Sequence, residues 1–413
     1  MNADRAVSAA IPRPAREEGG HGHALHAARF GDLDLADESV QDALVQAVET
    51  WSEKGIPLNP AGWLYTVAHN RAIDRLRRAA ASARRLAAAA PELASGPQPP
   101  EEVPIVEHSE VGDEQLRLML LCCHPALDRD AQVALTLRLV GGLTTPEIAA
   151  AFLVPEATLA QRIVRAKRKI RDARIPLTIP ADLGTRVEAL LTVLLLVFNE
   201  GYLSRSGVAT LRVDLAEQAI RLTDRARQLL PDHPEVEGLL ALELYQHARA
   251  EARLGDAGEL VLLRDQDRSR WDAALIRQAN ALVRGAVERG TIGPFLLQAL
   301  IASQHANTPS SGETDWSLIA DLYARLLAVS PTPVVAVNRA VAVGEADGPR
   351  AGLALLDEIS GIDGYHLLHA AHGELLARAG ETDAAIAALR RARDLAPSPA
   401  ERVHLERRLS ALE

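Results

Sequence analysis

The sequence predicts an all-α protein built from several helical domains. Ala, Leu and Arg dominate its 413 residues, and residues of this kind favour helices. Aromatic residues make up only 3% of the chain, so the aromatic-rich runs that favour strands are missing. The length is sufficient for two or three domains, each with a sizeable core. An all-β fold is therefore not expected.

Three further features bear on location and cross-linking. The longest apolar run, residues 190–198, is about half as long as a bilayer span requires. The first residues contain no apolar core of a signal peptide. The two cysteines, Cys122 and Cys123, are adjacent and cannot staple a domain. We expect a cytoplasmic protein without a membrane partner.

The N-terminal residues 1–28 are expected to form an irregular arm, because Gly and Pro recur in them. Three histidines in this arm, His21, His23 and His26, could bind a metal ion. A loose polar arm is the interpretation that we favour, and we expect no metal site and no cofactor.

Residues 29–86 predict a small helical domain of three helices, two of which are defined by their pattern. In the first, residues 34–51, Leu35, Val40 and Leu44 share one stripe. The second, residues 59–80, begins with Asn59 as N-cap and Pro60 in the first helical position. An acidic linker rich in Pro and Gly follows at residues 87–112, and it predicts little regular structure.

A second helical domain is expected at residues 113–176, and its last part predicts a helix-turn-helix at 144–171. Thr144 or Thr145 caps the first helix, and Pro155 and Glu156 open the second. The second helix places four apolar residues on one side at helical spacing: Leu159, Ile163, Ala166 and Ile170. Gln161 and Arg165 lie on its other side, where Arg and Gln side chains can reach base edges in a major groove.

The charge distribution supports an anionic partner. The net charge of −10 conceals two basic runs, at residues 71–85 and 162–174. A solvated helix face would explain either run alone, and a chance amphipathic hairpin could imitate the helix-turn-helix. The two signals together favour DNA binding.

Residues 181–413 predict a tetratricopeptide-like series of amphipathic helices with a net charge of −8. One 34-residue frame ends near Pro397 and assigns four positions where close helix packing is needed: Gly373, Ala385, Leu389 and Ala392. A weaker frame ending at Pro231 assigns the equivalent positions to Gly207, Ala219 and Ala226.

Residues 30–413 resemble a bacterial RNA polymerase sigma factor of the extracytoplasmic-function (ECF) group, in the subgroup with a long tetratricopeptide-like C-terminal extension. The stretches DLDLADESVQDALVQAVETW and NPAGWLYTVAHNRAIDRLRR resemble sigma-2, and the helix-turn-helix region resembles sigma-4. LCCHPAL and FNEGY resemble segments of the same subgroup. The sequence departs from the family at residues 16–32, where Gly19, Gly20 and Gly22 predict that the first sigma-2 helix is short or frayed.

The resemblance implies three sets of binding residues and two partners, core RNA polymerase (its beta and beta-prime subunits) and promoter DNA, both duplex and melted non-template strand. The implied core-binding residues are Asp34, Asp37, Glu38, Gln41 and Asp42. The implied contacts to the −10 element are Trp63, Asn70, Arg71, Asp74, Arg75, Arg77 and Arg78. The implied contacts to the −35 element are Thr145, Glu156, Thr158, Gln161, Arg162, Arg165, Lys167 and Arg168. Core packing is an equal alternative for Trp63.

We expect that the protein is not an enzyme. We expect the side chains of Cys122, Cys123 and His124 to be buried and not to bind zinc, because adjacent cysteines chelate one ion poorly. We expect Asn199 and Glu200 to cap a helix or to form internal hydrogen bonds, and residues 260–272 to form an internal network of charges or a domain contact. The C-terminal domain is expected to regulate activity and is a candidate site for a regulatory protein. The alternative function is a helix-turn-helix regulator with a tetratricopeptide sensor domain that does not join core polymerase.

Overall fold

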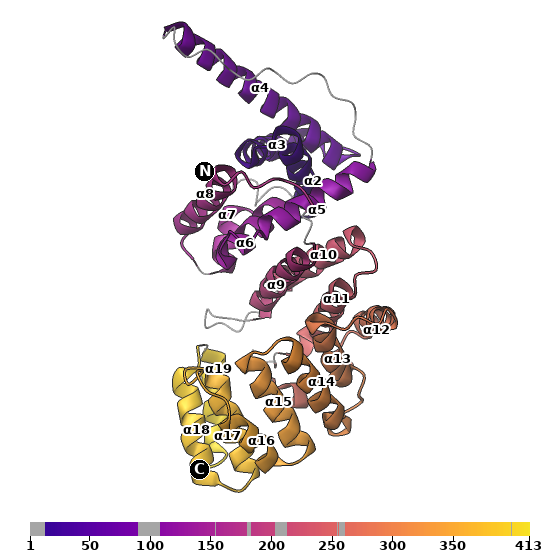
Figure 1. Ribbon diagram of the computed structural model, residues 1–413, viewed down its shortest axis with the longest axis vertical. Coiled ribbons are helices and arrows are strands. Elements are labelled where there is room, and N and C mark those ends of the chain that lie inside the picture. Colours follow the sequence, from indigo (N-terminus) through magenta and orange to yellow (C-terminus); the bar gives the residue numbers. More distant parts are fainter. Residues whose placement is uncertain are drawn as a thin grey trace. The chain divides into compact units, whose positions relative to one another are not determined.

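A computed structural model describes residues 13–89, 108–152, 154–179, 183–202, 213–253, 255, 261–397 and 399–413. Every regular element in these ranges is a helix, which confirms the all-α prediction (Figure 1). The chain divides into two compact units, residues 1–196 and 197–413. No helix among the described residues is both long and apolar enough to span a bilayer.

The first unit opens with α2 (Arg13–Phe30), α3 (Leu33–Lys54) and α4 (Pro60–Ala89). Asp32 caps α3 by accepting hydrogen bonds from the backbone N–H groups of Asp34 and Leu35. Gly55, with φ of 80°, ends the helix in a conformation that glycine adopts without strain. Asn59 accepts a hydrogen bond from Gly62 N at 2.9 Å, as expected of the N-cap of α4.

The expectation of an irregular arm is wrong for residues 13–28, since these residues lie in α2. The third helix of the domain therefore comes before residue 30. Small residues allow α2 to pack closely, and Ala24 and Ala27 are buried. His26 is buried too, with its ring 4.9 Å from that of Tyr65 in α4. Tertiary packing thus outweighs the low helix propensity of the glycines.

The linker expected at residues 87–112 is shorter at both ends than predicted. Helix α4 continues to Ala89, and α5 (His108–Cys122) begins within the expected linker. Residues 90–107, the remainder of the linker, lie outside the described residues, as do residues 1–12 of the expected arm.

The rest of the first unit contains the expected helix-turn-helix. After α5 come α6 (Arg129–Leu135), a five-residue π-helical turn η1 (Thr136–Val140), α7 (Thr145–Ala151) and α8 (Glu156–Asp172). Thr144 caps α7, and both its backbone N–H and its hydroxyl donate to Glu147 Oε2 at 2.8 Å. The predicted apolar stripe of α8 is confirmed, because all four of its members are buried: Leu159, Ile163, Ala166 and Ile170.

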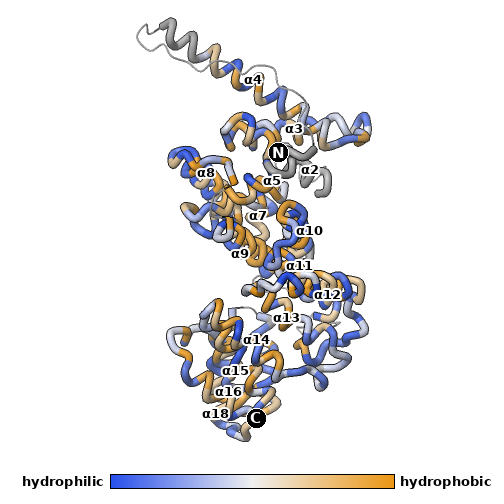
Figure 2. The backbone as a smooth tube through the Cα atoms, turned by 45° about the vertical axis from the view of Figure 1, so that its right-hand side comes forward, coloured by the Kyte–Doolittle hydropathy of each residue, from blue (hydrophilic) through white to orange (hydrophobic). Residues whose placement is uncertain are grey.

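Helix α9 (Leu183–Tyr202) contributes residues to both units. Among its described residues the second unit continues with α10 (Val213–Leu229), α11 (Pro234–His247), α12 (Ala273–Glu288), α13 (Pro294–Ala306), α14 (Trp316–Val329), α15 (Pro333–Ala346), α16 (Pro349–Asp357), α17 (His366–Arg378), α18 (Thr382–Leu395) and α19 (Pro399–Ser410). Short 3-10 turns lie at η2 (Ala250–Ala252), η3 (Leu263–Asp265), η4 (Arg268–Arg270) and η5 (Ser311–Glu313). Hydrophobic and hydrophilic residues alternate along α14–α16, as amphipathic helices require (Figure 2).

The packing of α17 on α18 agrees with the predicted repeat frame. A Cβ atom on Gly373 would lie 2.6 Å from Leu389 Cγ, so only glycine allows this approach. Ala385, Leu389 and Ala392 are fully buried. In the weaker frame Ala219 and Ala226 are fully buried as well, and Gly207 lies outside the described residues.

Candidate core-binding and DNA-binding surfaces

The outer face of α8 carries most of the side chains expected to contact duplex DNA. Thr158, Gln161, Arg165 and Arg168 are exposed, while Thr145 and Glu156 are half-buried. Arg162 is half-buried and forms an ion pair with Asp130 of α6 at 3.1 Å. The apolar stripe fixes the orientation of α8, so these exposed side chains project from a rigid support.

Lys167 differs from this expectation, because it is buried on the inner side of α8. Its Nζ lies 2.9 Å from Asp34 Oδ1 and 3.0 Å from Asp37 Oδ2, both in α3. Burial lowers the pKa of Lys167, but the two carboxylates outweigh burial and the net shift is upward. Lys167 is therefore an ammonium held inside the first unit and does not face solvent in this arrangement.

Asp37 is also buried, in contrast to the expectation of an acidic face without a local partner. Arg138 Nε of η1 and His23 Nε2 of α2 each lie 3.4 Å from its Oδ1. Burial raises the pKa of Asp37, but Arg138, His23 and Lys167 together hold the pKa well below its usual range. Asp37 is thus an ionised carboxylate at the junction of α2, α3, η1 and α8.

The other acids of the α3 face also have partners within the chain. Arg171 Nη1 of α8 lies 2.9 Å from Asp34 Oδ2. Arg75 of α4 pairs with Glu38 and donates from Nη2 to Asp42 Oδ2 at 2.8 Å. Gln41 is half-buried. Of the five residues expected to bind core polymerase, Glu38 is the only one whose side chain is mostly exposed.

The segment expected to contact melted DNA lies on α4. Asn70, Arg71, Asp74, Arg77 and Arg78 are exposed there. Arg71 also donates to Gln46 Oε1 at 3.0 Å, which ties it to α3.

Trp63 belongs to the core in this structure. Its ring is half-buried and meets the Trp51 ring edge-on at 5.4 Å. Sequence reasoning missed two exposed apolar residues just before α4, Ile56 and Leu58, which are 58% and 108% exposed. Their position in the loop between Gly55 and Asn59 could have indicated from the sequence that these apolar side chains are exposed.

Comparisons with known proteins match the two parts of the chain that carry these residues. The family model described as Sigma-70 region 2 matches residues 22–82, and the model described as Sigma-70, region 4 matches residues 117–170. An ECF RNA polymerase sigma factor, SigK of Mycobacterium ulcerans (strain Agy99), is 29% identical over 148 residues, or 34% of this chain and 73% of that protein. Uncharacterized protein R00370 of Rhizobium meliloti (strain 1021) is 40% identical over 388 residues, or 93% of this chain and 91% of that protein.

The chain thus contains sigma-70 regions 2 and 4, and these regions together with the similarity to SigK support a sigma factor of the ECF type. Sigma-70 families are not enzymes, and their domains interact with RNA polymerase and promoter DNA. The remaining match is to a family of unknown function, DUF6596, over residues 186–287. The similarity to R00370 covers 93% of the chain, so it includes most of the C-terminal extension as well as the two sigma-70 regions.

The residues whose types could suggest a chemical site are buried or closely packed. Cys122 and Cys123 are fully buried, and burial raises the pKa of the Cys123 thiol to about 12. Gly201 of FNEGY approaches Ala216 so closely that a Cβ would lie 2.8 Å from Ala216 N. Glu200 beside it is buried.

Arg268 joins the charged segment at residues 261–272 to the C-terminal end of α13. Arg268 donates to the carbonyl oxygens of His305 and Thr308, the latter at 2.6 Å. Its guanidinium carbon lies 4.7 Å from the centre of the Trp271 ring, and Trp271 is buried. These contacts join one cation to two backbone carbonyls and an aromatic ring, so they differ from the network of charges that the sequence predicted.

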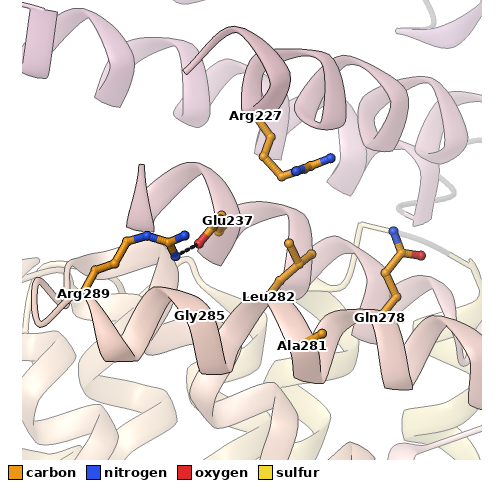
Figure 3. Close-up of a pocket in the computed structure, with 7 residues that line it drawn as sticks. All are labelled: Arg227, Glu237, Gln278, Ala281, Leu282, Gly285 and Arg289. Atoms are coloured by element: carbon orange, nitrogen blue, oxygen red, sulfur yellow. Dashed lines mark hydrogen bonds and ion pairs between the residues drawn. The ribbon is translucent and has the colours of Figure 1, made fainter. Parts of the chain in front are cut away.

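A shallow pocket of about 330 Å³ lies in the second unit, between α10, α11 and α12 (Figure 3). Arg289 pairs there with Glu237 at 2.7 Å and with Asp232 at 2.5 Å. Arg227, on the other side, pairs with Asp224 at 2.9 Å. Because both guanidinium groups already have carboxylate partners, the pocket does not offer an uncompensated positive charge to a ligand.

Proposed function

We propose that this sigma factor binds core RNA polymerase through the acidic face of α3 and directs the enzyme to promoters. In this proposal α8 contacts the −35 element, and the exposed face of α4 holds the melted non-template strand of the −10 element. The beta and beta-prime subunits are the expected polymerase contacts, and a basic coiled coil there would complement the acids of α3.

The observation that carries the proposal is the exposed polar face of α8 on a fixed helix-turn-helix. Gln161 and Arg165 are residue types that bind base edges in pairs of hydrogen bonds, and both are exposed. Arg168 lies one turn further along and can neutralise a phosphate. The same compact unit, residues 1–196, carries the acidic helix α3, so the proposal assigns both binding functions to this unit.

The core-binding half of the proposal is tested by charge reversal at Glu38. Its side chain is 58% exposed and lies in the middle of the implied face, whereas Asp37 is buried and its reversal would disturb the fold. We expect Glu38→Lys to weaken the affinity for core polymerase about tenfold, or about 1.4 kcal/mol. Glu53→Lys makes the same charge change at the exposed end of α3 and serves as the control. Equal affinities for both variants and the natural chain would remove α3 from the interface.

We further propose that the C-terminal unit regulates transcription. Its residues carry the larger part of the negative charge, with a net −8 over 181–413. Truncation after Tyr202 tests this and leaves α9 in place, whose residues Val187, Leu190 and Leu194 are buried. We expect the truncated protein to lose transcription activity, and a gain would identify an inhibitory role instead. Unchanged activity and unchanged DNA affinity would reject a regulatory role.

A further inference from the structure

Another pocket of the second unit lies between residues 261–265 and helix α19, and its volume is about 350 Å³. Val261 and Leu262 form its apolar wall on one side, and Ala411, just after α19, lies on the other. These two segments are far apart in the sequence, so tertiary packing builds the pocket rather than a local turn. A volume of this size is in the range of sites that hold small molecules.

The polar wall of this pocket carries one guanidinium group without a carboxylate partner. Arg408 donates to Glu374 of α17 at 2.6 Å, and Arg264, beside the pocket, lies 3.7 Å from Asp265. Arg407 lines the pocket and is exposed, and no carboxylate of the described residues lies within ion-pair distance of it. The pocket thus differs from the one between α10, α11 and α12, because it offers an uncompensated positive charge.

A histidine ring lies beside this guanidinium group. His404 precedes Arg407 by three residues in α19, so both side chains lie on one face of the helix. His404 is half-buried, and burial lowers its pKa. The carboxylates of Glu374 and Asp265 favour its charged form, whereas Arg264 and Arg407 oppose it, and the net shift of the pKa is downward. The ring is therefore uncharged near neutral pH and can donate a hydrogen bond to an anion held by Arg407.

We propose that this pocket binds a small organic acid, in which one carboxylate is attached to an apolar body. A guanidinium binds a carboxylate through two parallel hydrogen bonds, so Arg407 would hold the anion and His404 would donate to it. Val261, Leu262 and Ala411 would cover the apolar body. The single uncompensated charge matches an acid with one negative charge.

All residues of this site lie in the second unit, whereas the proposed DNA-binding and polymerase-binding residues lie in the first. Ligand binding is therefore measured on the full chain without polymerase or DNA, and its failure would leave the proposed sigma-factor function untouched. Only the consequence of binding rests on the proposed function, since a bound acid would give the regulatory unit a chemical input.

N-acetyl-leucine is the probe, because it carries one carboxylate and a branched apolar side chain. N-acetyl-leucinamide keeps the apolar part and removes the charge, and N-acetylglycine keeps the charge and removes the apolar part. NMR signals of the histidine rings follow the titration, and the absence of one signal in His404→Gln identifies that of His404. We expect N-acetyl-leucine to bind with a Kd of about 1 mM and the other two compounds about tenfold more weakly.

Two variants with the same charge change show whether the ligand lies in this pocket. Arg407→Gln removes the unpaired guanidinium and leaves Leu405 and Leu409, the buried residues on the inner side of α19, in place. We expect it to weaken the binding of N-acetyl-leucine about tenfold. Arg391→Gln removes an exposed arginine of α18 that does not line the pocket, and it should bind as the natural chain does. In the natural chain the bound acid should also raise the pKa of His404, because an anion beside the ring favours its charged form.

The acid-binding site would be overturned by equal binding of N-acetyl-leucine and its amide, or by an affinity of Arg407→Gln equal to that of the natural chain. Absence of saturation up to about 20 mM would overturn it as well. The tetrapeptide Ala-Ala-Ala-Leu ends in the same carboxylate and side chain, so it distinguishes a peptide C-terminus from a free acid. An affinity for this peptide more than about tenfold above that for N-acetyl-leucine would reject the small acid as the ligand.

Discussion

Replacing Lys167 with methionine removes the central cation of the first unit at nearly constant side-chain volume. Asp37 keeps Arg138 at 3.4 Å, and Asp34 keeps Arg171 at 2.9 Å, but both lose their contact with Nζ. Breaking a buried ion pair by deleting one partner costs about 3–5 kcal/mol, because the remaining charge stays buried. Since Arg138 remains close to Asp37 and Asp34 is partly exposed, we expect a loss of about 2–3 kcal/mol in the free energy of local opening.

Hydrogen exchange of peptides from α3 and α8 measures this loss, because it reports local opening even when the two units unfold separately. Lys169→Met is the matched control, since it deletes an exposed lysine from the same helix. The double variant Asp37→Asn/Lys167→Met should not recover the loss, because it also removes the carboxylate that lies 3.4 Å from the buried Arg138 guanidinium. Exchange in Lys167→Met within about 0.5 kcal/mol of the natural chain would refute the reasoning.

Three further predictions concern separate parts of the chain. Arg165→Ala should weaken the free energy of binding to the best promoter sequence by about 1–3 kcal/mol and relax selectivity at one base pair, which binding to a randomised −35 library measures. An equal loss of affinity for all sequences would indicate a phosphate contact instead. Burial lowers the pKa of His26 to about 4, so the unfolded chain takes up this proton near pH 6.5 and the folded chain does not. The free energy of unfolding should therefore fall as the pH drops from 6.5 towards 4, by about 2 kcal/mol at pH 5. Denaturation of the natural chain and of His26→Phe at pH 6.5 and pH 5 measures this loss, and an equal loss of stability in both proteins would contradict the prediction. Gly373→Ala should destabilise the second unit by about 1–3 kcal/mol in urea unfolding, because its Cβ would lie 2.6 Å from Leu389 Cγ, whereas Gly364→Ala, with open space around it, should be neutral.

Local patterns predicted the helices that carry the site, because amphipathic spacing and caps act within a few residues. The stripe from Leu159 to Ile170 and the cap at Thr144 or Thr145 both correspond to the structure, with Thr144 as the cap. The N-terminal helix was missed because its glycines argue against a helix, while its stability comes from packing against other helices.

The pairing of Lys167 with Asp37 joins positions 130 residues apart, so no local pattern could predict it. One signal was nevertheless present. Lys167 follows Ile163 by four residues and precedes Ile170 by three, which places it on the buried side of α8. A lysine in that position needs an acidic partner, since a buried ammonium without one is costly. Sequence alone does not say which acid supplies it.

The most direct test of the central claim is transcription by purified core RNA polymerase on fragmented genomic DNA, with and without the full chain. The sigma-factor account predicts that the chain alone directs defined start sites, and that transcripts from those sites disappear when the −35 element is mutated. A chain that binds particular DNA fragments but leaves core polymerase without new start sites would contradict the account.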